Sequence, residues 1–202
     1  RIAPMSVELQ SKSRTAVQTI LDAERPLIYI QSAEEDRVLG VLSRIAEERR
    51  PVRVDLFVWS VTEGLQQGGK PVRTQPDGPR AVLDFIVAHD RPAIFLLKDF
   101  HDFIRDAADI RRRLRDLYYR CLNTGKFAVI SSPVKLIPEE IEREIDFTEL
   151  PRPDLRELGE LLRVEADSIP GGQASLTEET VHVLTRGVQG LTFHEARHAL
   201  RR

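Results

Sequence analysis

Two histidines near the end of the sequence have the spacing of a zinc-binding motif. His194, Glu195 and His198 form H-E-x-x-H, which on a helix places both imidazoles on one face to bind Zn²⁺, with the glutamate as general base. Thr192 and Glu195 also have the spacing of a capping box, which would put both histidines in a first helical turn. A third ligand would have to come from elsewhere, such as His182. We therefore expect a helix cap, and a small zinc hydrolase is an alternative.

A glycine-rich string fits the phosphate-binding pattern G-x-x-x-x-G-K. It runs from Gly64 to Lys70, with the sequence GLQQGGK. A working loop of this kind follows a strand directly, starts a helix at its lysine and carries a hydroxyl for Mg²⁺. Here Pro71 takes the position of the hydroxyl, and the residues after it have the composition of a loop. The string predicts a flexible segment within a long loop over residues 60–79.

Polar residues follow two of the apolar runs that predict strands. Asp99 comes at the end of one run, where α/β folds place metal-binding or catalytic groups. Nucleotide hydrolases usually have a second acid next to it, but Phe100 stands there, so a helix N-cap is the favoured interpretation of Asp99. Ser131 and Ser132 end another run. Their hydroxyls could sense a γ-phosphate, although turn chemistry explains them more simply.

The elements that would position these residues alternate along the chain. Apolar runs predict strands over residues 27–30, 52–59, 93–97 and 127–131, with a possible fifth over 145–150. Apolar residues three and four apart predict helices over 33–50, 80–89 and 103–121. This alternation is typical of a parallel sheet with right-handed crossovers, so the predicted fold class is α/β.

The pattern changes after Pro151. Three further helices are predicted, near residues 155–162, 177–184 and 193–200, with no strand between them. The expected domains are an N-terminal helical segment (1–24), an α/β core (25–150) and a helical subdomain (151–202).

The composition excludes several classes of protein. The 202 residues are 41% apolar and 31% charged, with a net charge of −2 and a pI near 6.3. A strongly basic nucleic-acid module is excluded, and no apolar run approaches the roughly 20 residues of a membrane span. The single cysteine, Cys121, allows no internal disulfide and falls in a helical apolar stripe, so we expect an inert core thiol and a cytoplasmic location. Arginines between 105 and 120 alternate with aspartates and predict a solvated helix face.

Three segments together resemble a family of AAA-class ATPases. They are residues 25–30 (RPLIYI) with 34–37 (EEDR), residues 92–101 (PAIFLLKDFH) and residues 137–141 (IPEEI). The family is encoded in cyanobacteria and plastids as a conserved hypothetical reading frame, and the similarity extends from about Leu21 to Leu200. In that family a degenerate AAA-like half precedes a second half with the Walker motifs. The resemblance implies that this chain is the first half, with a RecA/AAA-like core and a helical lid.

The resemblance also assigns positions in a degenerate nucleotide site. The turn over residues 31–34 stands where the phosphate loop would be, without glycine or lysine. Asp99 matches the Walker B aspartate, Ser131 or Ser132 the sensor-1 position, and Arg197, after Gly190-Leu191, the sensor-2 region. With no lysine and no cradle of N–H groups, a triphosphate would have little to bind.

We therefore expect a domain that does not hydrolyse ATP. It would act in oligomerisation, regulation or partner binding, beside a C-terminal AAA module that supplies ATP and Mg²⁺ chemistry in the full-length protein. Self-association, that module or another protein are the expected partners; a membrane or a nucleic acid is not. A nucleotide sensor that uses Asp99, Ser131 and Arg197 without cleavage is the second alternative.

Overall fold

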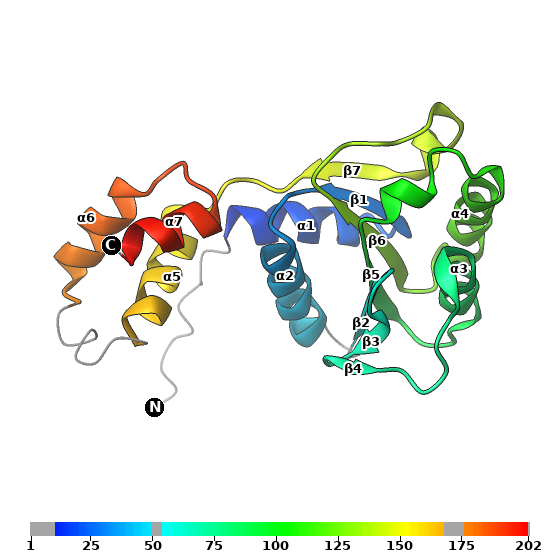
Figure 1. Ribbon diagram of the computed structural model, residues 1–202, viewed down its shortest axis with the longest axis horizontal. Helices are drawn as coiled ribbons and strands as arrows, with labels where there is room; N and C mark the ends of the chain where they lie inside the picture. The colour runs from blue at the N-terminus through cyan, green and yellow to red at the C-terminus, as the bar shows by residue number, and fades with distance from the viewer. Residues whose placement is uncertain (1–10, 50–53, 168–175, 202) are drawn as a thin grey trace. The chain divides into compact units, whose positions relative to one another are not determined.

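The computed structural model describes residues 11–49, 54–167 and 176–201 of the chain (Figure 1). The chain divides into two compact units. The first, here called the sheet unit, comprises Ala16–Leu150. The second, here called the helical unit, comprises Arg1–Thr15 and Pro151–Arg202.

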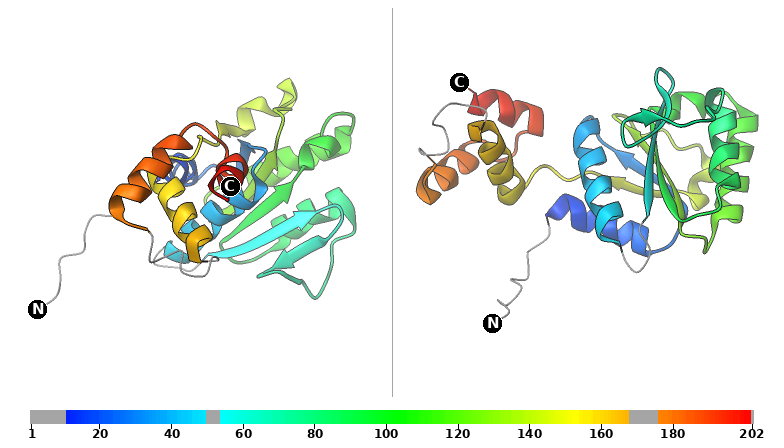
Figure 2. Two further views of the ribbon diagram at one scale, coloured as in Figure 1. Left: turned by 60° about the vertical axis from the view of Figure 1, so that its left-hand side comes forward. Right: turned by 90° about the horizontal axis from the view of Figure 1, so that it is seen from below.

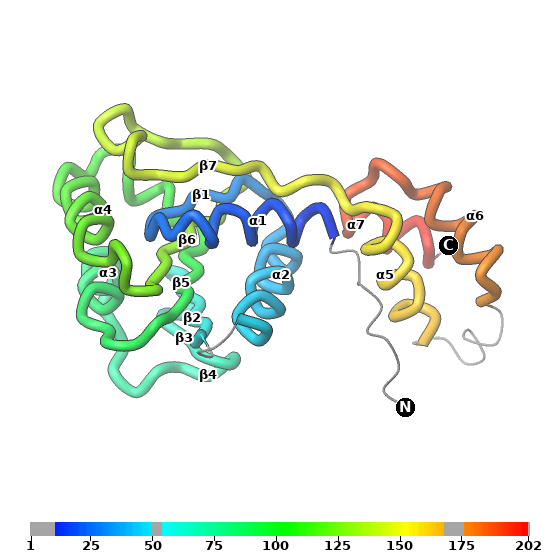
Figure 3. The backbone as a smooth tube through the Cα atoms, turned by 180° about the vertical axis from the view of Figure 1, so that it is seen from behind, coloured from blue at the N-terminus to red at the C-terminus, as the bar shows by residue number. Residues whose placement is uncertain are grey.

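A seven-stranded sheet in the order β4-β3-β2-β5-β6-β1-β7 forms the centre of the sheet unit (Figures 1 and 3). The strands are β1 (Leu27–Gln31), β2 (Asp55–Ser60), β3 (Gly64–Gln67), β4 (Lys70–Pro71), β5 (Ala93–Lys98), β6 (Lys126–Ser132) and β7 (Asp146–Glu149). The pairs β2–β5, β5–β6, β6–β1 and β1–β7 are parallel, whereas β2–β3 and β3–β4 are antiparallel. The α/β class is confirmed, and the possible fifth strand is present as β7. The sheet is mixed rather than wholly parallel.

Helices cover both faces of this sheet (Figures 1 and 2). Side chains alternate along β5, so that Ile94 and Leu96 pack with α1 (Lys12–Asp22) and α2 (Glu35–Glu48). Phe95 and Leu97 pack on the other face with α3 (Gly78–Ala88) and α4 (Ala108–Cys121). Because both faces are covered, the central strands are continuous apolar runs, which is why the sequence signals them so clearly.

The helix expected over 103–121 begins later than its apolar pattern predicted. A 3₁₀ turn, η1 (Phe100–Phe103), follows β5, and α4 begins only at Ala108. Phe103 and Ala107 still pack against the core, from outside α4. Cys121 is buried in that core, as predicted, and burial raises the pKa of its thiol. A second 3₁₀ turn, η2 (Glu139–Glu144), precedes β7.

The helical unit contains α5 (Leu155–Asp167), α6 (Glu178–Gly187) and α7 (Phe193–Leu200). These confirm the three predicted helices. Leu158, Leu161, Val188 and Ala196 form its small apolar cluster. Thr177 caps α6, because its side chain accepts a hydrogen bond from the Thr180 N–H at 3.1 Å. No helix among the described residues is long and apolar enough to cross a bilayer.

The prediction of an irregular loop over residues 60–79 is wrong. It contains the antiparallel strands β3 and β4. Gly68 and Gly69 join them with φ of +57° and +72°, which suits a two-residue turn that requires positive φ at both positions. Lys70 lies in β4, and the next helix begins only at Gly78, so the GLQQGGK string has no helix N-terminus to hold phosphate. The string is therefore a hairpin of two strands and not the irregular loop that the sequence predicted.

The strand β4 is only two residues long, and the side chain of Gln75 makes hydrogen bonds with the backbone of β3 beyond its end. The Leu65 N–H donates to Gln75 Oε1 at 2.8 Å, and Gln75 Nε2 donates to the Leu65 carbonyl at 2.8 Å. The same Nε2 reaches the Val72 carbonyl at 3.1 Å. Gly64 has φ of +68°, and a Cβ there would lie 2.5 Å from Gln75 Oε1. The side chain therefore satisfies the backbone of a residue whose own side chain is fully buried.

Replacement of this glutamine tests its role. We expect Gln75→Ala to lower the free energy of unfolding by about 1–2 kcal/mol, because the Leu65 N–H loses its acceptor, while the Leu65 carbonyl keeps only the Val72 N–H at 3.0 Å. Urea denaturation followed by Trp59 fluorescence measures the change. Gln67→Ala, at an exposed glutamine of the same hairpin, is the control and should change stability by less than about 0.5 kcal/mol. Equal effects of the two substitutions would contradict the account.

Candidate functional site

The carboxyl ends of three central strands bring the predicted site residues together. The Asp99 N–H donates to the Ser131 carbonyl at 2.9 Å, so the end of β5 is tied to the end of β6. The Ser32 N–H donates to the Ser132 carbonyl at 2.8 Å, which ties β6 to the turn after β1. Asp99, Ser131 and the β1–α2 turn therefore meet at one edge of the sheet, where open α/β sheets bind ligands.

The turn between β1 and α2 is short. Only Ser32, Ala33 and Glu34 separate the end of the strand from the start of the helix. A phosphate-binding loop of the G-x-x-x-x-G-K-[ST] type needs roughly eight residues to surround a phosphate with N–H groups. The Ser32 hydroxyl instead accepts a hydrogen bond from the Glu34 N–H at 3.0 Å, which closes the turn on itself. The connection therefore has neither the length nor the glycines for a phosphate cradle.

Acidic residues occupy the start of α2, where a phosphate would bind. Glu34, Glu35 and Asp36 are consecutive, and negative side chains are favoured at the positive end of a helix dipole. Glu34 Oε2 lies 2.8 Å from Arg37 Nη1, and both residues are buried. Glu35 Oε2 lies 3.0 Å from Lys98 Nζ, at the end of β5. The two nearby cations are thus already paired with carboxylates of the protein.

Asp99 and Ser131 lie at adjacent strand ends but differ in backbone conformation and in side-chain environment. Asp99 has φ of +50°, a left-handed conformation uncommon for a residue other than glycine. It takes the N-cap position of η1, but its carboxylate makes no capping hydrogen bond, so the N-cap interpretation is right only in position. Ser131 is buried on the same sheet face as Phe127 and Val129, towards α2. Its hydroxyl has no hydrogen-bond partner among the residues that the structure describes.

Arg197, the third predicted residue of this site, is engaged within the helical unit. Its Nε lies 2.9 Å from Glu165 Oε1. The other oxygen of Glu165, which is buried on α5, lies 2.5 Å from Arg201 Nε. Two arginines therefore surround one buried carboxylate and connect the end of α7 to α5.

The H-E-x-x-H segment forms the predicted capping box at the start of α7. The Thr192 N–H donates to Glu195 Oε2 at 2.8 Å, and the Glu195 N–H donates to Thr192 Oγ1 at 3.3 Å. The Thr192 hydroxyl also donates to Glu195 Oε2, at 2.8 Å, and the two hydrogen bonds that this carboxylate accepts from Thr192 hold the pKa of Glu195 below its usual value. Across the described residues, no group of three His, Cys, Asp or Glu side chains is placed to hold a metal ion. Glu195 therefore acts as a cap, and the geometry gives the zinc alternative no support.

Local spacing could have indicated the ion pair between Glu34 and Arg37, which are three residues apart on a helix. The ion pair between Glu35 and Lys98 was not predicted from the sequence. Glu35 and Lys98 are far apart in the sequence. Only the position of β5 beside the start of α2 brings them together, so no local pattern could have indicated the contact.

Parallel strands between two helical layers, with an aspartate and a serine at adjacent strand ends, define a RecA/AAA-like domain. The model of the SpoVK-like AAA ATPase N-terminal domain matches residues 13–150. The chain therefore belongs to the family of SpoVK-like AAA ATPase N-terminal domains. The resemblance stated from the sequence motifs is confirmed.

Two curated relatives support the same assignment. An uncharacterized AAA domain-containing protein, ycf46, of Guillardia theta is 31% identical over 188 residues, which is 90% of this chain and 35% of the relative. The protein of the same name from Gracilaria tenuistipitata var. liui is 26% identical over 184 residues, or 90% of this chain and 36% of that protein. The chain thus spans about a third of the length of these relatives.

Solved structures show the same fold at low sequence identity. Domain III of the Thermotoga maritima replication initiation protein DnaA has a TM-score of 0.51 at 13% identity, over 94% of this chain and 80% of that chain. A katanin structure has a TM-score of 0.57 at 12% identity, over 92% and 66%. The P216G mutant of Thermotoga maritima RuvB has a TM-score of 0.55 at 11% identity, over 100% and 65%.

The buried pair at the start of α2 can be tested by removing one charge. We expect Arg37→Met to lower the free energy of unfolding by about 3 kcal/mol, because the buried carboxylate of Glu34 loses the guanidinium 2.8 Å away. The double variant Glu34→Gln/Arg37→Met should recover at least half of that loss in a urea titration. A double variant no more stable than the single one would show that the pair does not interact as described.

The capping box predicts a pH-dependent contribution to stability. A carboxyl whose pKa is lowered by folding stabilises the fold above its unfolded pKa, and this contribution is lost as the pH falls through the folded pKa. We expect Glu195→Ala to lower the melting temperature at about pH 7 and to have much less effect at about pH 3. Glu179→Ala, at an exposed acid in the first turn of α6, is the control. A loss for Glu195→Ala that is the same at both pH values would contradict the prediction.

Proposed function

We propose that this domain does not hydrolyse ATP and instead acts as an oligomerisation, regulatory or partner-binding module of a longer AAA ATPase. The observation that carries the proposal is the β1–α2 turn. Its three residues leave no room for a phosphate cradle, and Glu34 and Glu35 take up the nearby cations. Without a lysine and N–H donors, a triphosphate meets three acids at the start of α2.

The length of the relatives supports separate roles for this domain and for the rest of the full-length protein. The chain corresponds to about a third of each AAA domain-containing relative, so most of their sequence lies outside the part that it resembles. In this proposal, the remaining part supplies the ATP-hydrolysing module, with its ATP and Mg²⁺. The katanin structure is described as the structural basis of katanin self-assembly, which supports self-association as one role for this domain.

A nucleotide sensor is the second candidate. It is favoured by the adjacent strand ends that carry Asp99 and Ser131, and by the buried Ser131 hydroxyl without a partner among the described residues. Such a site would bind ATP or ADP without cleaving it. Its weakness is that the phosphates would have to displace the ion pairs of Glu34 and Glu35.

Calorimetry separates the two candidates. We expect titration of about 1 mM Mg-ATP or Mg-ADP into the 202-residue chain to give no saturable heat, and incubation with ATP to release no phosphate above the blank. An AAA domain with an intact Walker motif serves as the positive control. A micromolar dissociation constant that is lost in Ser131→Ala would contradict the proposal and favour the sensor.

A further inference from the structure

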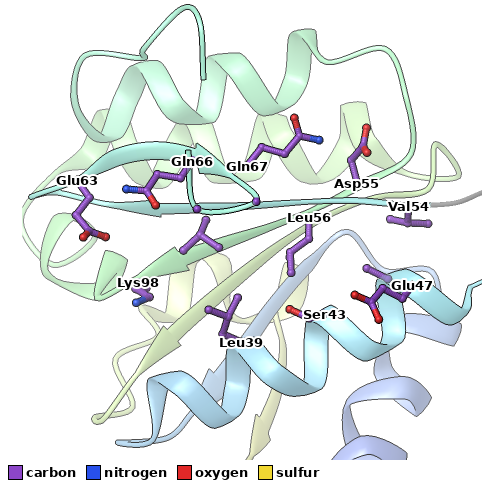
Figure 4. A pocket seen from close by; sticks show the side chains of 14 residues that line it. Leu39, Ser43, Glu47, Val54, Asp55, Leu56, Glu63, Gln66, Gln67 and Lys98 are labelled. Atoms are coloured by element: carbon purple, nitrogen blue, oxygen red, sulfur yellow. The ribbon is translucent and has the colours of Figure 1, made fainter. Parts of the chain in front are cut away.

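Two hollows flank the β3–β4 hairpin, one on each side of the sheet. The first lies between α2 and the strands β2 and β3 and reaches Lys98, whose charge is matched by Glu35 at 3.0 Å (Figure 4). The second lies on the α3 side and has a volume of about 410 Å³. It is here called the α3 hollow. Its described lining residues all belong to the sheet unit, and none of them is a residue of the carboxyl-edge site.

A row of paired residues explains why the α3 hollow is open. Strand pairing places Phe95, Phe57, Gln67 and Lys70 side by side across β5, β2, β3 and β4. Residues directly opposite each other point to the same face of a sheet. Phe57 and Phe95 stack at 4.9 Å beneath α3, and the Phe85 ring lies 6.1 Å from that of Phe57. Gln67 and Lys70 continue the row but are exposed, and Gln67 points away from α2 (Figure 4). The helix therefore covers the aromatic part of the row and leaves the hairpin part open.

The charge of the α3 hollow is positive. Lys70 and Arg73 line it, and none of its described lining residues is an acid. Neither side chain has a hydrogen bond or an ion pair with any residue of the described ranges 11–49, 54–167 and 176–201. Asp77 and Asp84, the acids at the start and middle of the adjacent α3 segment, are outside the lining, and Asp84 pairs with Arg113 at 2.8 Å. Two uncompensated cations therefore face one hollow of a chain whose net charge is −2.

The other side of this chemistry is apolar. Phe85 and Val72 line the α3 hollow and are half-buried, Pro71 is exposed, and the nearly buried Phe57 closes the floor. An incoming aromatic ring can meet Phe85 edge to face and extend the cluster that Phe85 forms with Phe57. The cations beside it can also lie over the face of such a ring. The lining therefore suits an aromatic group that carries negative charge.

The form of the α3 hollow selects a protein segment as its occupant. Small-molecule sites bury about 70–90% of their ligand, whereas most of this lining is itself exposed. Tight nucleic-acid binding rests on roughly 6–10 phosphate contacts, and two cations do not supply them. A protein partner needs to place only one anchor here. Pro71 has no N–H to offer at the outer edge of β4, so recognition depends on side chains and not on an added strand.

We infer that the α3 hollow binds an acidic segment of a protein partner in which a phenylalanine or tyrosine lies between carboxylates. The ring contacts Phe85 and Val72, and the carboxylates pair with Lys70 and Arg73. The inference rests on the proposed partner-binding role and gives that role a surface and a recognition chemistry.

Fluorescence anisotropy tests this binding with defined probes. A labelled Gly-Ser-Glu-Phe-Glu-Ser-Gly peptide is titrated with the 202-residue chain at about 0.1 M salt, where charges more than about 10 Å apart are screened. We expect saturable binding with a dissociation constant below about 200 µM. Peptides with lysine in place of both glutamates, or serine in place of phenylalanine, should bind at least about fivefold more weakly, because each loses one part of the complementarity.

Charge reversal in the protein locates the site. Lys70→Glu/Arg73→Glu should weaken binding of the glutamate peptide at least about fivefold and strengthen binding of the lysine peptide. Arg105→Glu/Arg120→Glu, with the same change of charge at two exposed arginines, is the matched control and should leave both affinities unchanged. Urea denaturation followed by Trp59 fluorescence shows that each variant is folded.

Several results would overturn the inference. Absence of saturable binding, equal effects of the two charge reversals, or equal affinity for the serine peptide would each contradict it. Displacement of the peptide by about 1 mM Mg-ATP would make a nucleotide the occupant. Self-association that is lost only in Lys70→Glu/Arg73→Glu would make the occupant a second copy of the chain.

Failure of this inference is distinguishable from failure of the proposed function. Binding of Mg-ATP that is lost in Ser131→Ala concerns the carboxyl edge and would contradict the non-hydrolysing role. The peptide titration and its charge reversals concern Lys70 and Arg73, which lie outside that edge.

Discussion

The short connection between β1 and α2 is the constraint on which the site depends. Because only three residues join the strand to the helix, the start of α2 lies directly over the ends of β1, β6 and β5. Glu34 and Glu35 then meet Arg37 and Lys98 at the start of α2, where a helix N-terminus favours an anion. The acids favour the positive end of the helix dipole, and the cations offset their charge. In the proposed function, the same contacts that stabilise the turn leave no unpaired cation there for a triphosphate.

The rest of the sheet unit follows from this arrangement. The parallel strands carry Asp99 and Ser131 to the same edge, and we propose that this edge keeps the scaffold of a nucleotide site without its phosphate-binding part. A domain in this state can still present surfaces. One such surface is the hollow between α2 and the strands β2 and β3, which reaches Lys98 at the end of β5.

The sequence predicted the central strands because burial on both faces makes them continuous apolar runs, as in residues 93–97. It did not predict β3 and β4, because edge strands are short and polar, and GLQQGGK has the composition of an irregular loop. The cap at Thr192 was predictable from local spacing, whereas the pair of Glu35 with Lys98 depends on strand order. Asp99 and Ser131 were placed together by the rule for carboxyl edges. Arg197 could not be placed, because its bond to Glu165 depends on how α5 and α7 pack.

Amide-resolved NMR of the isotope-labelled chain tests the central claim most directly. The signals of Ser32, Ala33, Glu35 and Asp99 report on the turn after β1 and on the adjacent end of β5. If the internal ion pairs fill the phosphate position, addition of millimolar Mg-ATP leaves these signals where they are, apart from the uniform drift caused by ionic strength. Saturable shifts confined to these amides would show that the turn binds a triphosphate and would contradict the account.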